Sequence, residues 1–305
     1  MATGVMEAGH HPSAPRFATR FAPSPTGRLH IGHAYSALLA HEAAQARAGR
    51  FLLRIEDTDL TRCRPAYEEA IYEDLAWLGL DWERPVRRQS EHLDRYRAAI
   101  DELAARGLAY RCFLSRKDVL NAIETEGRGA LDGPDGPVFF GGPLSPEDEA
   151  ARLARGEAFS WRLSVAACRA ALGTEADALT FDEAGEGPAG ERGLVRADIA
   201  LLGDAIIGRK DTGVSYHLAA VLDDADQKIT DVVRGADVFP STHLHRLLQR
   251  LLGLPTPVYR HHRLILRPDG KRFSKSDTSV TLADMRAEGA TPADIHARLG
   301  LPPAA

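Results

Sequence analysis

A short apolar stretch at Phe17–Phe21 runs into the turn sequence PSPTG, and an alanine-rich segment at 32–48 follows closely. Proline removes a backbone donor and glycine permits a tight turn, so PSPTG ends a strand. The Ala, Leu, Gln and Glu residues after it favour a helix, which Gly49 can close as a C-cap. A strand that turns into a helix begins a βαβ unit. This segment therefore predicts a parallel sheet with crossover helices.

The same alternation continues along the chain and predicts an α/β protein built on a Rossmann-type parallel sheet. LVRADIALLGDAIIG is expected to resume the parallel order after an interruption, and the last helix gives a helical C-terminal end. We expect further strands in FLLRIEDTD, LVRADIALLGDAIIG, KITDVVRG and RLIL, and further helices at 65–78, 93–106, 213–224, 241–253 and 281–299.

The interruption has a composition of its own. Residues 121–149 contain six glycines and four prolines with little periodicity, which indicates a small inserted subdomain. The predicted organisation is a disordered tail at 1–15, two halves of the sheet domain at 16–110 and 193–255, the insertion at 111–192 between them, and a terminal segment with a basic loop and a helix at 256–305.

Composition restricts the classes of function. A net charge of −5 argues against broad coating of nucleic acid, although it leaves room for a local basic contact. The three cysteines lie far apart without a C-x-x-C pair, which fits reduced thiols. The chain shows neither a secretory apolar region nor an apolar run of membrane-spanning length. We expect a cytoplasmic monomer that makes no membrane contact.

Two histidines, His30 and His33, stand where the first turn meets the first helix. In an open α/β sheet this position lies at the carboxyl end of a strand and beside a helix N-terminus, which attracts anions. Residues three apart can share one helix face, so both imidazoles could donate to a phosphate group. Two other interpretations stay open from this motif alone. The histidines could be surface or internally satisfied groups, or half of a metal site whose further ligands are not visible.

A second motif, KRFSKS at 271–276, lies far down the chain in a loop that contains glycine. Together, HIGH and KRFSKS resemble the HIGH and KMSKS signatures of class I aminoacyl-tRNA synthetases. The resemblance implies the fold of that class and extends to its glutamyl branch over roughly residues 16–300. It is carried by RFAPSPTGRLHIGH, RIEDTD, SYHLA, VLDDADQKITDVVRGADV and LLGLPTP.

Within that branch the chain resembles the truncated relatives that act on queuosine. Only 29 residues follow Ser276, whereas full glutamyl-tRNA synthetases carry an anticodon-binding domain there. The resemblance implies ATP-dependent, tRNA-independent activation of L-glutamate to glutamyl-adenylate, with Mg²⁺ accompanying the ATP. Glutamate is then transferred to queuosine at the wobble position of tRNA(Asp). The alternatives are a conventional glutamyl-tRNA synthetase core that lacks its anticodon domain and a non-catalytic tRNA-binding relative.

The resemblance also assigns roles to individual residues. The catalytic groups would be His30, His33 and Lys275, which would bind the ATP phosphates, and no covalent nucleophile is needed. Catalysis would come from positioning and from stabilising phosphate charge. An arginine can hold a carboxylate through two parallel hydrogen bonds, and a carboxylate can hold the substrate ammonium. The residues implied to bind glutamate are Arg20, Phe21, Ala22, Pro23, Ser24, Glu56, Tyr216 and Arg234.

Several of these residues also have a purely structural interpretation. Arg20 could be a surface strand arginine in a salt bridge, and Tyr216 could pack in the core. Glu56 could cap the following segment, a role that Asp57 or Asp59 would serve equally well. Within the matched motifs the functional interpretation is preferred.

Two departures from the family pattern affect what is expected. The queuosine-directed relatives commonly carry a zinc site that begins C-x-C, but Leu114 takes the second ligand position after Cys112. VFFGGPL stands where the later ligands would be sought. Zinc needs about four such ligands, so we predict no structural zinc and a subdomain held by packing alone. Phe273 replaces the methionine of KMSKS, and because the position stays apolar we expect little effect.

Overall fold

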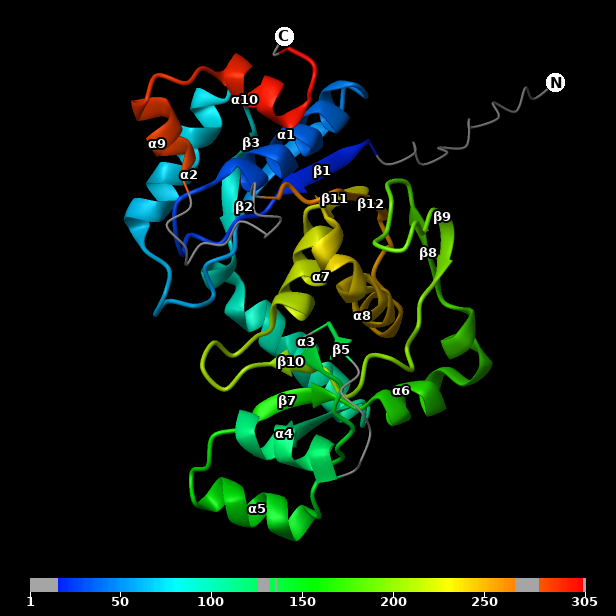
Figure 1. Ribbon diagram of the computed structural model, residues 1–305. Coiled ribbons are helices and arrows are strands. Elements are labelled where there is room, and N and C mark those ends of the chain that lie inside the picture. Colours follow the sequence, from blue (N-terminus) through cyan, green and yellow to red (C-terminus); the bar gives the residue numbers. More distant parts are fainter. Residues whose placement is uncertain (1–15, 126–131, 135, 267–279, 304–305) are drawn as a thin grey trace, which may run out of the picture.

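The computed structural model describes residues 16–125, 132–134, 136–266 and 280–303, and its central feature is a mainly parallel sheet (Figure 1). The strands are β1 (Ala18–Phe21), β2 (Arg50–Ile55), β3 (Glu83–Arg88), β8 (Thr180–Glu183), β11 (Asp231–Gly235) and β12 (Val258–His262). Parallel neighbours lie in the orders β3-β2-β1 and β11-β12-β8. The amide of Thr230 donates to the carbonyl of Ala18 at 2.9 Å and joins β11 to β1. The predicted Rossmann-type sheet is confirmed.

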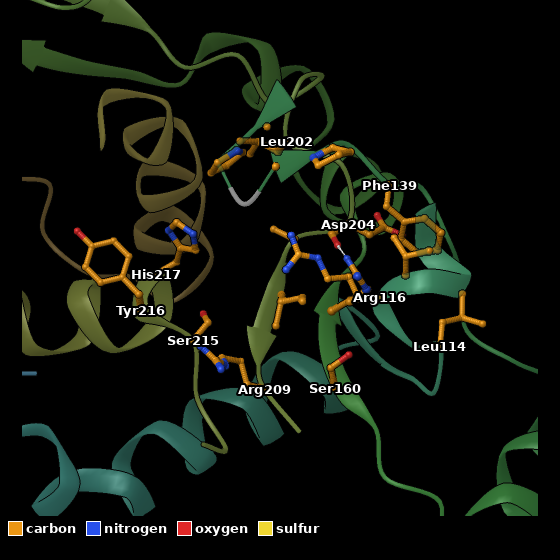
Figure 2. A pocket seen from close by; sticks show the side chains of 18 of the residues that line it. Leu114, Arg116, Phe139, Ser160, Leu202, Asp204, Arg209, Ser215, Tyr216 and His217 are labelled. Atoms are coloured by element: carbon orange, nitrogen blue, oxygen red, sulfur yellow. Dashed lines mark hydrogen bonds between the residues drawn. The ribbon is translucent and has the colours of Figure 1, made fainter. Parts of the chain in front are cut away.

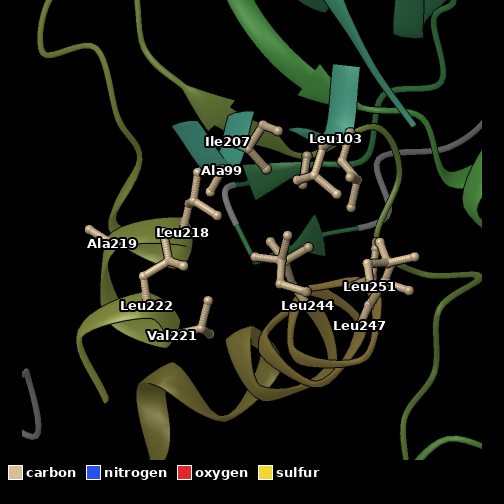
Figure 3. Packing of buried hydrophobic residues seen from close by; sticks show 14 of the residues in the cluster. Ala99, Leu103, Ile207, Leu218, Ala219, Val221, Leu222, Leu244, Leu247 and Leu251 are labelled. Carbon is tan, nitrogen blue, oxygen red and sulfur yellow. The ribbon is translucent and has the colours of Figure 1, made fainter. Parts of the chain in front are cut away.

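Helices cover both faces of this sheet. On one face lie α1 (Ile31–Gln45), α2 (Pro65–Trp77), α9 (Leu282–Ala287) and α10 (Pro292–Leu299), and on the other lie α3 (Leu93–Ala105), α7 (Tyr216–Asp226) and α8 (Phe239–Leu251). Successive strand residues point to opposite faces, so Leu53 packs with the first group and Leu52 with the second. Figure 3 shows the second core, where apolar side chains of α3, α7 and α8 meet.

The inserted region forms an antiparallel sheet in the order β10-β7-β4, at the lower end of Figure 1. Its elements are β4 (Ala109–Cys112), α4 (Arg116–Thr125), the two-residue strands β5 (Asp132–Gly133) and β6 (Gly136–Pro137), α5 (Pro146–Ala154), β7 (Ser160–Leu163), α6 (Val165–Leu172) and β10 (Ile206–Gly208). Arg111 ties α5 to this sheet, because it pairs with Glu149 and its guanidinium lies over the rings of Phe159 and Trp161. An arginine stacked on aromatic rings is a packing contact that needs no metal.

The expectation that LVRADIALLGDAIIG resumes the parallel order is wrong. Its first part forms β9 (Gly193–Arg196), which pairs antiparallel with β8, and its last part forms β10 in the inserted sheet. The chain turns between them at Gly203, whose φ of 59° and close approach to the Phe139 backbone suit a residue without a side chain. Apolar runs predict strands, but they do not determine which sheet a strand joins.

Two expectations near the C-terminus are also corrected. The strand lies in VYRHH, as β12, rather than in RLIL. Its alternate residues Tyr259 and His261 are buried, and the polar character of histidine hid that alternation. The single helix predicted at 281–299 is the pair α9 and α10, because Gly289 adopts a φ of 89° and Thr291 caps a new helix. The helices expected at 65–78, 93–106, 213–224 and 241–253 are confirmed within a few residues at each end.

The predicted domain boundaries stay predictions, and the boundary between 110 and 111 falls inside β4. The tail predicted at 1–15 lies outside the described residues. None of the described helices combines the length and the apolar character that crossing a bilayer requires.

Asp74 on α2 is a buried carboxylate whose two oxygens have no hydrogen-bond partner within the described chain. The guanidinium of Arg286 on α9 lies 3.6 Å away. Burial raises the pKa of Asp74 to about 6. Above that pH the folded protein therefore holds a charge that burial disfavours. At low pH, beneath the ordinary aspartate pKa, the group is neutral in the folded and unfolded states alike and the cost vanishes.

We therefore expect Asp74→Asn to raise the free energy of unfolding by about 2 kcal/mol more at about pH 7.5 than at about pH 4.5, where only part of the cost remains. Urea unfolding at the two pH values measures the difference. Glu73→Gln is the matched control, because Glu73 is exposed and also lies 3.6 Å from Arg286. It should show no such pH dependence. An equal effect of Asp74→Asn at both pH values would contradict the assignment.

Candidate active site

A small cavity opens beside β1 and β11, where the chain order along the sheet reverses. Open α/β sheets bind ligands at such a point, outside the carboxyl ends of the strands. The cavity has a volume of about 150 Å³, enough for several water molecules or one small polar molecule. Its lining residues are Arg20, Phe21, Ala22, Ser36, Glu56, Tyr216, Val233 and Arg234. Six of the eight residues implied to bind glutamate are thus brought together in one space.

The remaining two, Pro23 and Ser24, shape the loop behind the cavity. The carbonyl of Pro23 accepts a hydrogen bond from the amide of Glu56 at 3.0 Å, and the carbonyl of Ser24 accepts one from Thr26 at 2.9 Å. The first bond ties the loop after β1 to the residue after β2, and the second lies within the loop. Pro23 therefore helps to fix Glu56 through the backbone.

Arg20 is a buried arginine, so its interpretation as a surface residue is wrong. Its Nε and Nη2 donate to Asp224 on α7 at 2.9 Å and 3.4 Å. Asp224 also accepts from Nη1 of Arg54 at 2.7 Å. Burial acts to raise the pKa of Asp224, but the guanidiniums of Arg20 and Arg54 outweigh it and hold that pKa below its usual range. Asp224 is therefore ionised and fixes Arg20 at the cavity wall.

Glu56 brings a carboxylate to the same cavity. Its Oε1 accepts a long hydrogen bond of 3.4 Å from Nη2 of Arg54. Burial raises the pKa of Glu56, although the charges of Arg54 and Arg20 act in the opposite direction. A cationic group that entered the cavity would stabilise the ionised form, so Glu56 suits an ammonium. Asp57 instead accepts from the amide and hydroxyl of Ser90 at 2.9 Å and 2.6 Å and serves local structure.

Arg234 on β11 is the second cationic residue of the cavity. Its Nη1 donates to the hydroxyl of Tyr216 at 3.3 Å and to Nδ1 of His245 at 3.2 Å. Its Nε donates to Nε2 of His261 at 3.1 Å, and its Nη2 to Thr242 at 2.7 Å. Tyr216 is 39 % exposed, so it is not a core-packing residue. The cavity thus combines two guanidiniums with one carboxylate.

His30 and His33 begin α1, the helix that also carries Ser36. Nδ1 of His30 accepts from the amide of Gly32 at 3.1 Å, and Nδ1 of His33 accepts from the amide of His30 at 3.2 Å. The two rings are stacked with centroids 3.7 Å apart. Because each Nδ1 is an acceptor, each neutral ring carries its proton on Nε2. The pair therefore presents N–H donors at the positive end of a helix, which suits an anion better than a metal ion.

The described segment that begins at residue 280, after the second signature, lies beside the histidine pair. Lys275, with the rest of KRFSKS, lies outside the described residues. Thr281 pairs with His30 in an isolated antiparallel bridge, and the amide of Leu282 donates to the carbonyl of Leu29 at 2.9 Å. The fold therefore anchors the segment after the basic loop beside the two histidines.

A larger cavity of about 980 Å³ lies between the inserted region and α7 (Figure 2). Arg116 and Phe139 line it from the insertion, and Tyr216 and His217 line it from α7. Tyr216 belongs to the walls of both cavities. A space of this size can take a ligand much larger than an amino acid.

Some residues that shape the site were not predicted from the sequence. Ser36 and Val233 line the small cavity, and Asp224 and His261 fix its two arginines. Asp224 lies within VLDDADQKITDVVRGADV, so the motif carried a signal. The pairing of Asp224 with Arg20 spans 204 positions and was not visible without the fold.

The segments around Cys112 and VFFGGPL, where we predicted no structural zinc, make other contacts in the structure. Cys112 is buried in β4, and Tyr110 donates to Asp204 at 2.8 Å. Gly141 in VFFGGPL donates its amide to the same carboxylate at 2.9 Å. Within the described residues, no three His, Cys, Asp or Glu side chains gather in a metal-binding arrangement.

Comparison with known proteins places this geometry in a family. Residues 16–303 match the model of the class I tRNA synthetase catalytic domain for E and Q. A glutamyl-Q tRNA(Asp) synthetase of Rhodobacter capsulatus is 47 % identical over 93 % of the chain and 99 % of its own length. A second, from Nocardia farcinica, is 40 % identical over 94 % of the chain and 86 % of its own length.

The chain is also similar to longer proteins. A glutamate–tRNA ligase of Synechococcus sp. is 38 % identical over 90 % of the chain, which spans 55 % of that protein. A crystal structure of a glutamate tRNA ligase from Elizabethkingia meningosepticum, in complex with its amino acid, superposes with a TM-score of 0.71 and 29 % identity. That match covers 91 % of this chain and 59 % of the other.

Removing the shared carboxylate tests how the small cavity is built. Asp224→Asn removes the carboxylate that two buried guanidiniums share and is expected to lower the free energy of unfolding by about 3–5 kcal/mol. Because the pKa of Asp224 is depressed, this loss is present above the ordinary aspartate pKa and shrinks as the pH falls through the folded-state pKa. Denaturant unfolding across acidic and neutral pH measures both effects.

Asp226→Asn on the same helix is the matched control. Asp226 pairs with Arg87 at 3.0 Å, but its side chain is partly exposed, so the expected loss is about 1 kcal/mol or less. Equal losses in the two variants would show that the buried triad does not stabilise the fold as described.

Proposed function

Because the chain belongs to the catalytic-domain family of class I tRNA synthetases for glutamate and glutamine, we propose that it activates L-glutamate with ATP and transfers it to queuosine in tRNA(Asp). Membership of that family, together with the names of its similar relatives, supports a glutamate ligase. The proposal adds the activation of glutamate without tRNA and the identity of the acceptor.

The charge pattern of the small cavity is the observation that carries the proposal. L-glutamate has two carboxylates and one ammonium, and the cavity has two guanidiniums, Arg20 and Arg234, and one carboxylate, Glu56. The ionised form of the largely buried Glu56 would be stabilised by a nearby cation, so Glu56 receives the ammonium. The guanidiniums receive the carboxylates through charge-assisted hydrogen bonds. Glutamine lacks one of the two negative charges and would leave one guanidinium poorly compensated.

Activation follows from placing ATP beside this cavity. An oxygen of the substrate's α-carboxylate attacks the α-phosphorus of ATP, and the bond to pyrophosphate breaks. The Nε2–H groups of His30 and His33, with the N-terminus of α1, stabilise charge on the phosphates. Lys275 neutralises charge that builds towards pyrophosphate. ATP would bind as its Mg²⁺ complex, and the metal would supply further screening of the phosphate charge.

Transfer uses the neighbouring larger cavity. A hydroxyl of the queuosine nucleoside attacks the glutamyl carbonyl, and AMP leaves with the electron pair of the broken bond. The cavity between the insertion and α7 has room for a nucleoside and meets the glutamate cavity at Tyr216. The high identity to two glutamyl-Q tRNA(Asp) synthetases supports this acceptor. The conventional glutamate–tRNA ligase reaction is the alternative, since ligases of that name are also 36–38 % identical.

ATP–pyrophosphate exchange with L-glutamate and Mg²⁺, first without tRNA, tests the proposal. We expect exchange with glutamate, little with glutamine or aspartate, and charging of queuosine-containing tRNA(Asp). Unmodified tRNA(Asp) is the control acceptor and should stay uncharged. Exchange that starts only when tRNA(Glu) is added would support the conventional ligase. Silence in both conditions would refute the assignment as a catalyst.

A substitution at His30 separates its phosphate role from its capping role. Asparagine can still cap α1 through its side-chain oxygen but lacks the Nε2–H donor. We expect His30→Asn to lower kcat for exchange by about 10²–10³-fold while unfolding stability changes little. His30→Ala should show the same loss of rate and also lose about 1 kcal/mol of stability. A wild-type rate in His30→Asn would contradict the phosphate role.

A further inference from the structure

Arg234 is surrounded by neutral acceptors rather than by carboxylates. Its guanidinium donates hydrogen bonds to His261, His245, Tyr216 and Thr242. The two histidines are nearly inaccessible to solvent. Burial lowers the pKa of His261 and lowers that of His245 still further, with the charge of Arg234 acting in the same direction. Both rings are therefore neutral, as acceptors of an arginine N–H must be.

The tautomer of His261 is determined by Glu183 at the end of β8. Nε2 of His261 accepts from Arg234, so the ring proton lies on Nδ1, where it donates to Oε2 of Glu183 at 2.5 Å. The other carboxylate oxygen, Oε1, accepts the amides of His261 and Gly185 at 2.9 Å and 2.8 Å. Glu183 is 2 % exposed, so water does not replace these contacts.

We infer that Glu183 is a positioning residue for glutamate recognition, which acts by holding His261 in the tautomer that accepts from Arg234. Glu183 contacts neither the cavity nor, on the proposed function, the substrate. The inference rests on that proposed function, because it takes Arg234 as a glutamate contact. It adds Glu183 and His261 as a pair outside the cavity that determines specificity. Because His261 accepts from Arg234 as a neutral ring, no carboxylate next to Arg234 compensates the charge that a substrate carboxylate would meet.

The isosteric change Glu183→Gln tests this directly. Two backbone amides hold Oε1, so the glutamine keeps its carbonyl oxygen there and turns its NH₂ group towards Nδ1 of His261. The imidazole must then carry its proton on Nε2, where it opposes the Nε–H of Arg234. We expect the KM for glutamate to rise roughly tenfold or more, kcat to change less than about threefold, and the KM for ATP to stay unchanged.

A second variant distinguishes this role from a structural one. In Glu183→Gln/His261→Gln, the amide at position 261 can turn its oxygen towards Arg234 whatever stands at 183. We expect the double variant to bind glutamate more tightly than Glu183→Gln alone. Two substitutions that merely damaged packing would instead make binding weaker still, and that result would overturn the inference.

Asp231→Asn is the matched control. Asp231 lies on the same strand as Arg234, is also buried, and accepts from Arg260 on β12 at 2.7 Å without contacting Arg234. It should leave the KM for glutamate unchanged. A rise like that of Glu183→Gln, or a wild-type KM in folded Glu183→Gln, would refute the positioning role.

Calorimetric titration with glutamate distinguishes failure of the positioning role of Glu183 from failure of the proposed function. If wild-type protein binds glutamate and Glu183→Gln binds it equally well, the positioning role fails and the proposed function stands. If wild-type protein neither binds glutamate nor exchanges pyrophosphate in its presence, the proposed function fails and the positioning role fails with it. We expect the wild-type protein and Asp231→Asn to bind glutamate equally well, and Glu183→Gln to bind it more weakly.

Discussion

A carboxylate shared by two buried arginines holds the small cavity together. Asp224 accepts from Arg20 and from Arg54, so one residue of α7 is tied to β1 and β2 at once. Burying three charged side chains costs free energy, and close ion pairs with good hydrogen-bond geometry must offset that cost. The ion pairs with Asp224 fix Arg20 at the cavity wall. They also hold Arg54 where its guanidinium lies 3.4 Å from Oε1 of Glu56. The positions of a cation and an anion in the cavity both follow from this contact.

The two arginines of the cavity are held in different ways, and the difference has an electrostatic consequence. Arg20 lies against an ionised carboxylate, so much of its charge is already compensated. Arg234 lies among imidazoles and hydroxyls, and its nearest anion along the hydrogen bonds is Glu183, on the far side of His261. The positive charge of Arg234 is therefore less compensated by its hydrogen-bond partners than that of Arg20.

The sequence predicted what depends on neighbouring residues. PSPTG ends β1 because prolines and glycine determine the backbone of their own turn. The HIGH segment therefore lies at the start of α1, as expected. The sequence did not predict contacts between residues far apart in the chain. Examples are the pairing of β10 with the inserted sheet and the ion pair of Arg20 with an aspartate 204 positions away. β12 escaped notice because His261, a buried residue with a polar side chain, breaks the apolar alternation that marks a strand. The residue that hid the strand is the one that supports Arg234.

Helix α7 connects the two cavities mechanically. Tyr216 begins the helix and lines both spaces, while Asp224 lies eight residues further along and anchors Arg20. At 1.5 Å per residue the two positions are separated by about 12 Å along one rigid element. On the proposed function, the same helix therefore holds both Arg20, which binds the amino acid, and the wall that the two cavities share. An intermediate that formed in the small cavity, as we propose, would already lie next to the larger one, and such proximity favours acyl transfer.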